Sequence, residues 1–154
     1  MGRITPMKNN DFAVFILTHG RPDNVITFET LKRQGYTGEI YIICDNEDKT
    51  IEQYRQRFGD KVIVFDKAEI EKKIDTGDNF GDRRTILHAR NACFEIAKEL
   101  GLKYFLQLDD DYYEFQYKIN HKMEYPTNHL TVLSNLGNVF DSFFTYYKSI
   151  GAKS

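Results

Sequence analysis

Four short, mainly apolar runs recur along the chain, and turn-forming or acidic residues follow each of them. The runs cover residues 12–17, 39–44, 62–65 and 104–108. Nearly continuous apolar runs of this length are typical of strands that are buried on both faces. Segments with helical spacing lie between them, at about 24–34, 50–58 and 83–100. This alternation predicts a three-layer α/β fold with one mainly parallel sheet covered by helices.

The remaining segments are less regular. Residues 75–82 contain two glycines and no periodicity, and we interpret them as a loop over a site. Residues 113–118 alternate well enough to predict a further strand, and 119–131 are irregular. A last helix is predicted at about 135–150, because its apolar residues form one wide stripe.

Composition limits the class of protein. With 154 residues, 41% of them hydrophobic, we expect one domain with a substantial core. The formal net charge of −2 gives no global basic field for nonspecific nucleic-acid binding. No apolar run approaches the roughly 20 residues that span a bilayer, and no signal-peptide pattern occurs, so we expect a cytoplasmic protein with no membrane partner. Cys44 and Cys93 lie in apolar segments, which predicts two small buried side chains rather than a disulfide.

The most distinctive feature of the chain is the run of three carboxylates after the strand at 104–108. If the backbone stays extended, Asp109 and Asp111 share one side and Asp110 takes the other. Adjacent negative charges repel one another, and hard oxygen ligands suit Mg²⁺ or Mn²⁺. The sequence therefore predicts a metal site at Asp109 and Asp111. The alternative is a solvated acidic turn that caps a following helix.

Polar loops follow every predicted strand. In an open parallel sheet, ligands bind outside the carboxyl ends of the strands, where these loops converge. The loops offer carboxylates, hydroxyls and a guanidinium, which is an inventory suited to a nucleotide diphosphate. They are residues 18–23, 45–48, Asp66 and 109–111.

Arg90 falls within the apolar sector of the predicted helix at 83–100, with Arg83 beside it. A guanidinium stays charged in a protein and is costly to bury unpaired. Arg90 therefore needs a carboxylate or a phosphate as its partner. A structural ion pair with a strand-end aspartate and a phosphate contact are both compatible with the pattern.

Together these motifs resemble the nucleotide-sugar half of GT-A glycosyltransferases of the family-2 type. The resemblance rests on Thr18-His19-Gly20-Arg21-Pro22 after the first strand, Asp45-Asn46 after the second, Ala89-Arg90-Asn91 on a helix, and Leu108-Asp109-Asp110-Asp111. It covers about residues 12–118, and leaves 119–150 as a C-terminal loop and helix of the same domain. The chain also resembles the phage TET-associated glycosyltransferases, whose proposed acceptors are hydroxymethylated pyrimidines in phage DNA.

The resemblance implies a Rossmann-like GT-A fold and a metal-dependent transferase that uses a UDP-sugar donor with Mn²⁺ or Mg²⁺. It also implies modified DNA bases as acceptors and, for a phage protein, the host cytoplasm as location. It assigns the nucleoside to Thr18 and Arg21, the uracil imide to Asp45, the diphosphate to Arg90, the ribose to Asp109 or Asp110, and the metal to Asp111. Arg83, beside Arg90 on the predicted helix, is a further candidate for the diphosphate.

The chain departs from the family pattern after the carboxylates, because no residue stands out as a catalytic base. Asp141 is expected on the solvated face of the last helix, and Glu114 and Glu124 are no better candidates. His121 and His129 are expected to be exposed loop residues rather than metal ligands. A noncatalytic module that binds a nucleotide sugar is therefore one alternative. A nucleotidyltransferase is another, although its first loop is normally richer in glycine than this one.

Overall fold

The computed structural model describes residues 7–73, 86–119, 122–125 and 131–150. Its centre is a four-stranded sheet in which every neighbouring pair of strands is parallel. The strands are β1 (Phe12–Leu17), β2 (Glu39–Asp45), β3 (Val62–Phe65) and β4 (Tyr104–Asp109), in the spatial order β3-β2-β1-β4. All four match the apolar runs of the sequence, so the predicted sheet is confirmed.

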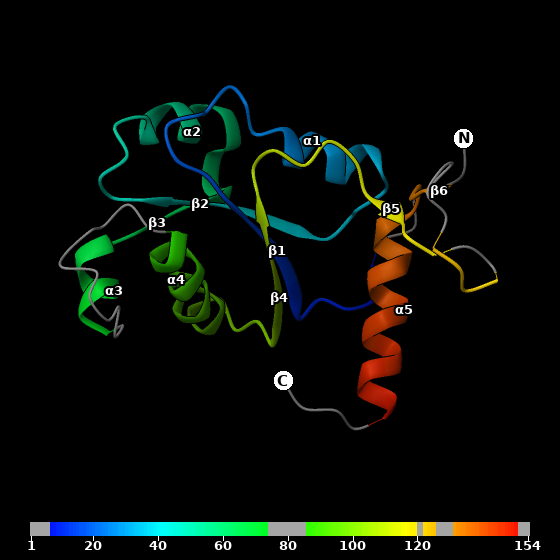
Figure 1. Cartoon of the computed structure of the whole chain (residues 1–154). Coiled ribbons are helices and arrows are strands. Elements are labelled where there is room, and N and C mark those ends of the chain that lie inside the picture. Colours follow the sequence, from blue (N-terminus) through cyan, green and yellow to red (C-terminus); the bar gives the residue numbers. More distant parts are fainter. Residues whose placement is uncertain (1–6, 74–85, 120–121, 126–130, 151–154) are drawn as a thin grey trace.

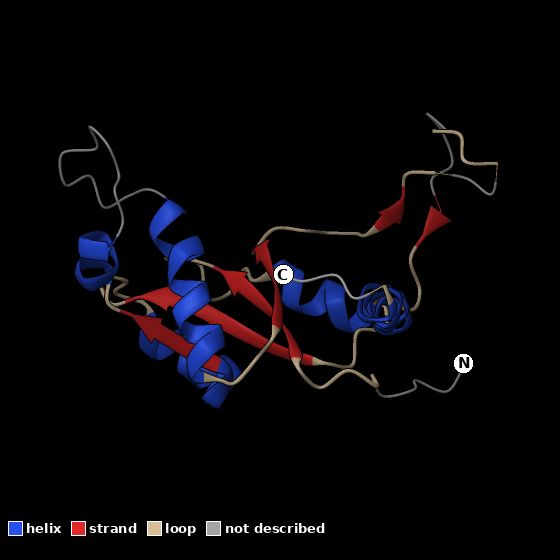
Figure 2. Cartoon of the chain, turned by 90° about the horizontal axis from the view of Figure 1, so that it is seen from below, coloured by secondary structure: helices blue, strands red, loops and turns tan. Residues whose placement is uncertain are grey.

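Helices cover both faces of this sheet (Figures 1 and 2). One face packs against α1 (Ile26–Arg33), α2 (Ile51–Phe58) and α5 (Leu136–Ser149), and the other against α3 (Lys67–Lys73) and α4 (Ile86–Glu99). A 3-10 turn, η1 (Gly59–Lys61), leads into β3, and the short strands β5 (Gln116–Tyr117) and β6 (Thr131–Val132) form a separate antiparallel pair. The three-layer arrangement agrees with a Rossmann-like GT-A fold.

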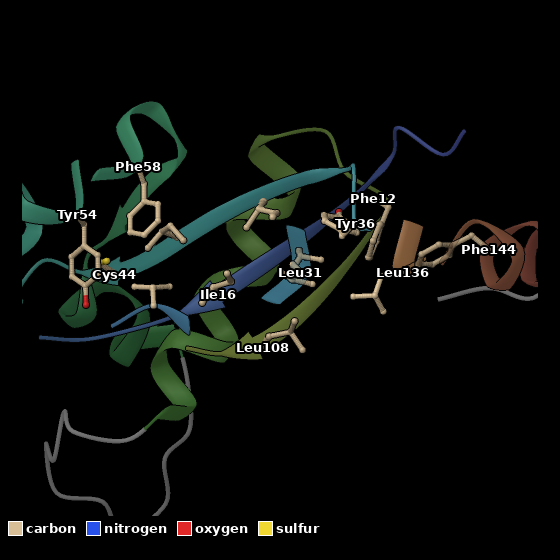
Figure 3. Close-up of a cluster of buried hydrophobic side chains, with 14 residues drawn as sticks. Phe12, Ile16, Leu31, Tyr36, Cys44, Tyr54, Phe58, Leu108, Leu136 and Phe144 are labelled. Atoms are coloured by element: carbon tan, nitrogen blue, oxygen red, sulfur yellow. The ribbon is translucent and has the colours of Figure 1, made fainter. Parts of the chain in front are cut away.

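Alternate side chains of β1 enter two different cores. Phe12, Val14 and Ile16 face one core, whereas Ala13, Phe15 and Leu17 face the other. All six β1 residues are buried, which explains why the run is apolar without alternation. Figure 3 shows the first core, in which Tyr54 and Phe58 of α2 lie toward one end and Phe144 of α5 toward the other.

Both cysteines are fully buried free thiols, as the sequence predicted. Cys44 lies in the first core and Cys93 in the second, on opposite faces of the sheet. Burial raises the pKa of each thiol to about 12. Both thiols are therefore protonated at neutral pH and pack as small apolar groups.

Several expectations need correction. The sequence did not predict α3, and the strand expected at 113–118 is reduced to the two residues of β5. Asp141 was expected to be solvated, but it is 9% exposed and accepts hydrogen bonds from the backbone N–H groups of Lys8 (2.8 Å) and Asn9 (3.0 Å). This aspartate therefore holds the segment before β1 against α5. The loop expected at 75–82 lies outside the described residues.

Within the described part of the chain, no helix is long and apolar enough to cross a bilayer. The strand order nevertheless fixes where a ligand would bind. The chain runs from β1 outward to β2 and β3, and then returns to place β4 on the other side of β1. This reversal between β1 and β4 is the topological switch point, where open α/β sheets form a crevice at the carboxyl ends of their strands.

Candidate functional site

A cleft of about 640 Å³ lies at the carboxyl ends of the strands. Residues at or just beyond the end of each of the four strands line it, as the sequence predicted for converging loops. From β1 come Thr18, His19 and Arg21, from β2 Asp45, from β3 Lys67, and from β4 the three aspartates 109–111. Ala89 of α4 contributes to the wall. The cleft therefore combines carboxylates with cationic side chains.

Asp110 is the buried centre of this cleft, with 1% of its surface exposed. One carboxylate oxygen accepts a 2.6 Å hydrogen bond from Thr18 Oγ1, and the other lies 3.1 Å from Arg21 Nη2. Both carboxylate oxygens are therefore held by side chains of the loop after β1. Asp110 thus joins the end of β4 to the loop after β1 across the switch point.

The backbone leaves the extended conformation directly after Asp109, which corrects the expected alternation of the three carboxylates. Residues 110 and 111 form a turn. Thr27, at the start of α1, holds this turn in place: its Oγ1 donates to the Asp109 carbonyl (2.6 Å) and accepts from the Tyr112 N–H (2.9 Å), and its N–H donates to the Asp110 carbonyl (3.1 Å). The turn allows all three aspartates to line one cleft.

Asp109 forms an ion pair with Arg90 of α4. Arg90 Nη2 lies 3.1 Å from Asp109 Oδ1, and both side chains remain more than a third exposed, at 38% and 37%. Gln107 supports the arginine, because its side-chain amide donates to the Arg90 carbonyl at 2.7 Å. The ion pair that the sequence left open is therefore present, and Arg90 still reaches solvent beside the cleft.

Asp111 differs from its two neighbours. It is exposed and makes no hydrogen bond or ion pair with any other described residue. Among the described residues, no group of three or more His, Cys, Asp and Glu side chains forms a ready-made metal site. A divalent ion here would therefore be held by Asp111 and Asp109, with phosphate and water oxygens completing its shell. Mg²⁺ is commonly bound in this way.

On the opposite wall, Asp45 lies between two cationic or hydrogen-bonding side chains. His19 Nδ1 is 2.6 Å from Asp45 Oδ2, and Lys67 Nζ is 3.8 Å from Asp45 Oδ1. The Lys67 side chain is only 11% exposed. These contacts hold the Asp45 carboxylate at the cleft wall, where it can act as a hydrogen-bond acceptor.

A scan against protein-family models matched residues 12–151 to the family described as TET-Associated Glycosyltransferase. The chain belongs to this family. The match extends over the sheet, the cleft and α5, so the cleft is the candidate site of a glycosyltransferase. Comparison with curated proteins and with solved structures found no match.

In this TET-associated glycosyltransferase, two buried residues support the β1 loop. Sequence reasoning did not assign Tyr54 to the site, and it included Asp48 only as part of the polar loop 45–48. Tyr54 of α2 is fully buried, and its hydroxyl lies 2.8 Å from Thr18 Oγ1 and accepts from the Arg21 N–H at 2.8 Å. Burial is the largest influence on this phenol and raises its pKa, although the hydrogen bonds with Thr18 and with the Arg21 N–H oppose the shift. In the sequence, Tyr54 is simply an aromatic position of a predicted helix.

Asp48 is the second supporting residue, with 4% of its surface exposed. It accepts hydrogen bonds from the Gly20 N–H (2.8 Å) and from the N–H (2.8 Å) and Oγ1 (2.7 Å) of Thr50. Burial alone would raise the pKa of this carboxyl, but the hydrogen bonds outweigh burial and lower it. Gly20 itself has a positive φ of 68°, a conformation that glycine adopts at little cost.

The structure thus shows where some of the site residues predicted from the sequence lie, and leaves others outside its described part. Thr18, Arg21, Asp45, Asp109, Asp110 and Asp111 line the cleft, with Arg90 paired to Asp109 beside them. Arg83, His121 and His129 lie outside the described residues.

Proposed function

We propose that this chain transfers a hexose from a UDP-sugar to an acceptor hydroxyl with the help of Mn²⁺ or Mg²⁺, and that a hydroxymethylated base in DNA is its acceptor. The family match supports glycosyl transfer in general. The observation that carries the finer proposal is the arrangement of the cleft, in which Asp109 and Asp111 at the end of β4 face Asp45 of β2 and Arg90 is paired to Asp109 beside the cleft. Groups that can bind phosphate and metal on one side, and a hydrogen-bond acceptor for a base on the other, suit a nucleotide diphosphate.

The nucleoside would lie between the loops after β1 and β2. A carboxylate accepts hydrogen bonds and cannot donate them, so Asp45 is matched to the N3–H of uracil. Thr18 and Arg21 form the neighbouring wall, and Asp110 keeps both in place. The same geometry favours UDP over ADP, because adenine offers no ring N–H at the corresponding position.

The diphosphate would lie toward Arg90 and the three aspartates. Asp109 and Asp111 would hold a divalent metal ion, which would neutralise negative charge on the UDP leaving group. Arg90 is exposed enough to turn from Asp109 toward a phosphate oxygen, and its guanidinium geometry suits that contact. Positively charged groups fixed around a developing negative charge are commonly the largest catalytic contribution.

In the transfer, the bond between the sugar anomeric carbon and the UDP oxygen breaks, and its electron pair remains on UDP. The acceptor hydroxyl oxygen forms the new bond to the anomeric carbon and loses its proton to a base. Asp141 does not fill this role, because it is engaged with Lys8 and Asn9 beside α5 and does not line the cleft. We therefore assign donor binding and leaving-group stabilisation to the cleft, and we assign no base.

Product analysis tests this proposal. The chain is incubated with UDP-glucose, Mn²⁺ and hydroxymethylated DNA, and both UDP release and sugar on the DNA are measured. Asp111→Asn is the test variant, and Asp60→Asn is the matched control, because Asp60 is an exposed aspartate of η1 outside the cleft. We expect UDP release by the wild type and the control and loss of it in Asp111→Asn. Absence of both products from folded wild-type protein would contradict the proposal and favour a nucleotide-sugar-binding module.

A further inference from the structure

A second hollow, of about 770 Å³, lies along β4 between α4 and α5. We call it the β4 groove. Its lining is mainly aromatic, and includes Phe94 of α4, Phe105 of β4 and Phe143 of α5. Phe94 is 62% exposed and Phe143 is 58% exposed, which is unusual for two large apolar side chains that flank one hollow. Arg90, which pairs with Asp109, also lines this groove, so the groove adjoins the carboxyl-end cleft.

The backbone beside the groove is a strand edge. In the described part of the chain, β4 is the last strand of its sheet and pairs on one side only, with β1. The Tyr104 N–H donates to the Asp11 carbonyl in that pairing. Successive residues of a strand direct their backbone N–H and C=O groups to opposite sides. Phe105 and Gln107 therefore direct these groups away from β1, toward the open edge. An apolar edge of this kind is a template for a further strand.

We propose that a second copy of this chain binds there, through antiparallel pairing of β4 with β4 of the partner. A twofold axis that passes between the two Leu106 residues places Phe105 opposite Gln107 of the partner subunit. Both residues direct backbone groups outward, so this register lets them exchange hydrogen bonds, whereas a register shifted by one residue would not. The sheet would become a continuous eight-stranded sheet across the dimer.

Charge complementarity supports the same register. Lys103 is an exposed residue immediately before β4, and Asp109 is the last residue of β4. With Leu106 on the axis, Lys103 of each copy lies opposite Asp109 of the other. The symmetry repeats this pair, so each end of the strand ladder has one attractive contact. The partner's lysine would then join Arg90 at Asp109, at the edge of the candidate site.

The other exposed strand edge of the sheet favours this pairing less. β3 has four residues, whereas β4 has six, and the apolar groove runs along β4. Pairing of β3 with β4 of another copy would also be a head-to-tail contact, which does not close under a twofold axis. The β4–β4 contact is self-complementary and closes as a dimer.

Sedimentation velocity of the full chain over a range of concentrations tests the dimer. Lys103→Glu places like charges opposite each other at both ends of the ladder, and we expect it to weaken dimerisation by roughly tenfold or more. Combining it with Asp109→Lys restores opposite charges and should restore the dimer. Lys98→Glu is the matched control, because Lys98 is an exposed residue of α4 that does not line the groove.

Cross-linking tests the register. In this register the two Leu106 residues lie directly opposite each other but exchange no backbone hydrogen bonds. The Cα atoms of such a pair are about 4.5 Å apart, which is close enough for a disulfide. Leu106→Cys should therefore give a disulfide-linked dimer under mild oxidation, whereas Lys98→Cys should not. The two native thiols are buried and do not interfere. A monomer at every concentration, open-ended polymers, or equal cross-linking of both variants would overturn the proposal.

Discussion

Thr18 and Asp110 join the ends of two neighbouring strands through a 2.6 Å hydrogen bond that is buried at the switch point of the sheet. They are 92 residues apart in the sequence. Thr18 Oγ1 also lies 2.8 Å from the Tyr54 hydroxyl, so the threonine connects the carboxylate to α2. This network positions the β1 loop, with Arg21 at its surface, against the turn of aspartates.

We expect Thr18→Val to lower the free energy of unfolding by about 1–3 kcal/mol, because it leaves buried polar atoms of Asp110 and Tyr54 without their partner. Urea unfolding measures this change. Thr18→Ser keeps the hydroxyl and is the control. Equal stability of the valine variant and the wild type would show that the network contributes nothing to the fold.

Arg90 should affect ligand binding more than stability. Its ion pair with Asp109 is more than a third exposed on both sides, and such pairs contribute about 0–1 kcal/mol. If Arg90 contacts the diphosphate, Arg90→Gln should weaken UDP binding by roughly tenfold or more, because a charge-assisted hydrogen bond is lost.

Calorimetric titration with UDP and Mn²⁺, together with urea unfolding, separates these two effects. Lys98→Gln removes a positive charge from the exposed surface of the same helix and should change neither quantity. A large loss of stability in Arg90→Gln with unchanged UDP affinity would instead assign Arg90 a purely structural role.

The lowered pKa of Asp48 leads us to expect that the free energy of unfolding depends on pH in a specific way. Hydrogen bonds hold its pKa in the folded state below the ordinary value, so the unfolded state binds the proton more readily. The stability that Asp48 contributes is therefore present above about pH 4, near the pKa of a free aspartate, and is lost as the pH falls through the lower folded value.

The measurement is urea unfolding of wild type and Asp48→Asn from acidic to neutral pH. We expect the difference in unfolding free energy to be largest at neutral pH and to shrink in acid. Asp60→Asn, at an exposed position, should follow the wild type. A difference between Asp48→Asn and wild type that did not change with pH would contradict the assigned cause.

Local pattern was sufficient to predict the central sheet. Each strand is a mainly apolar run with a polar loop after it. β1 shows why, since residues such as Val14 and Phe15 fill cores on opposite faces. α3 was not recognised, because it is short and has one buried apolar residue, Ile70, among charged neighbours. Its position depends on packing against the second core rather than on a visible periodicity.

The errors at individual aspartates share a physical cause. Asp141 has the sequence context of a solvated helix position, but its partners Lys8 and Asn9 are more than 130 residues away. The turn at Asp110 likewise depends on Thr27, which lies 82 residues before Asp109. Such long-range hydrogen bonds leave no local signal. The convergence of strand-end loops was predictable, because parallel topology alone requires it.

The central claim is that the cleft binds UDP with a divalent metal at Asp109 and Asp111. Calorimetric titration of the wild type with UDP, ADP and GDP, each with and without Mn²⁺, tests it most directly, with Asp111→Asn and Asp60→Asn titrated alongside. We predict that UDP binds more tightly than ADP or GDP, that this binding requires Mn²⁺, and that Asp111→Asn loses it while Asp60→Asn keeps it. Binding of metal and UDP by Asp111→Asn with the affinity of the wild type would contradict the account.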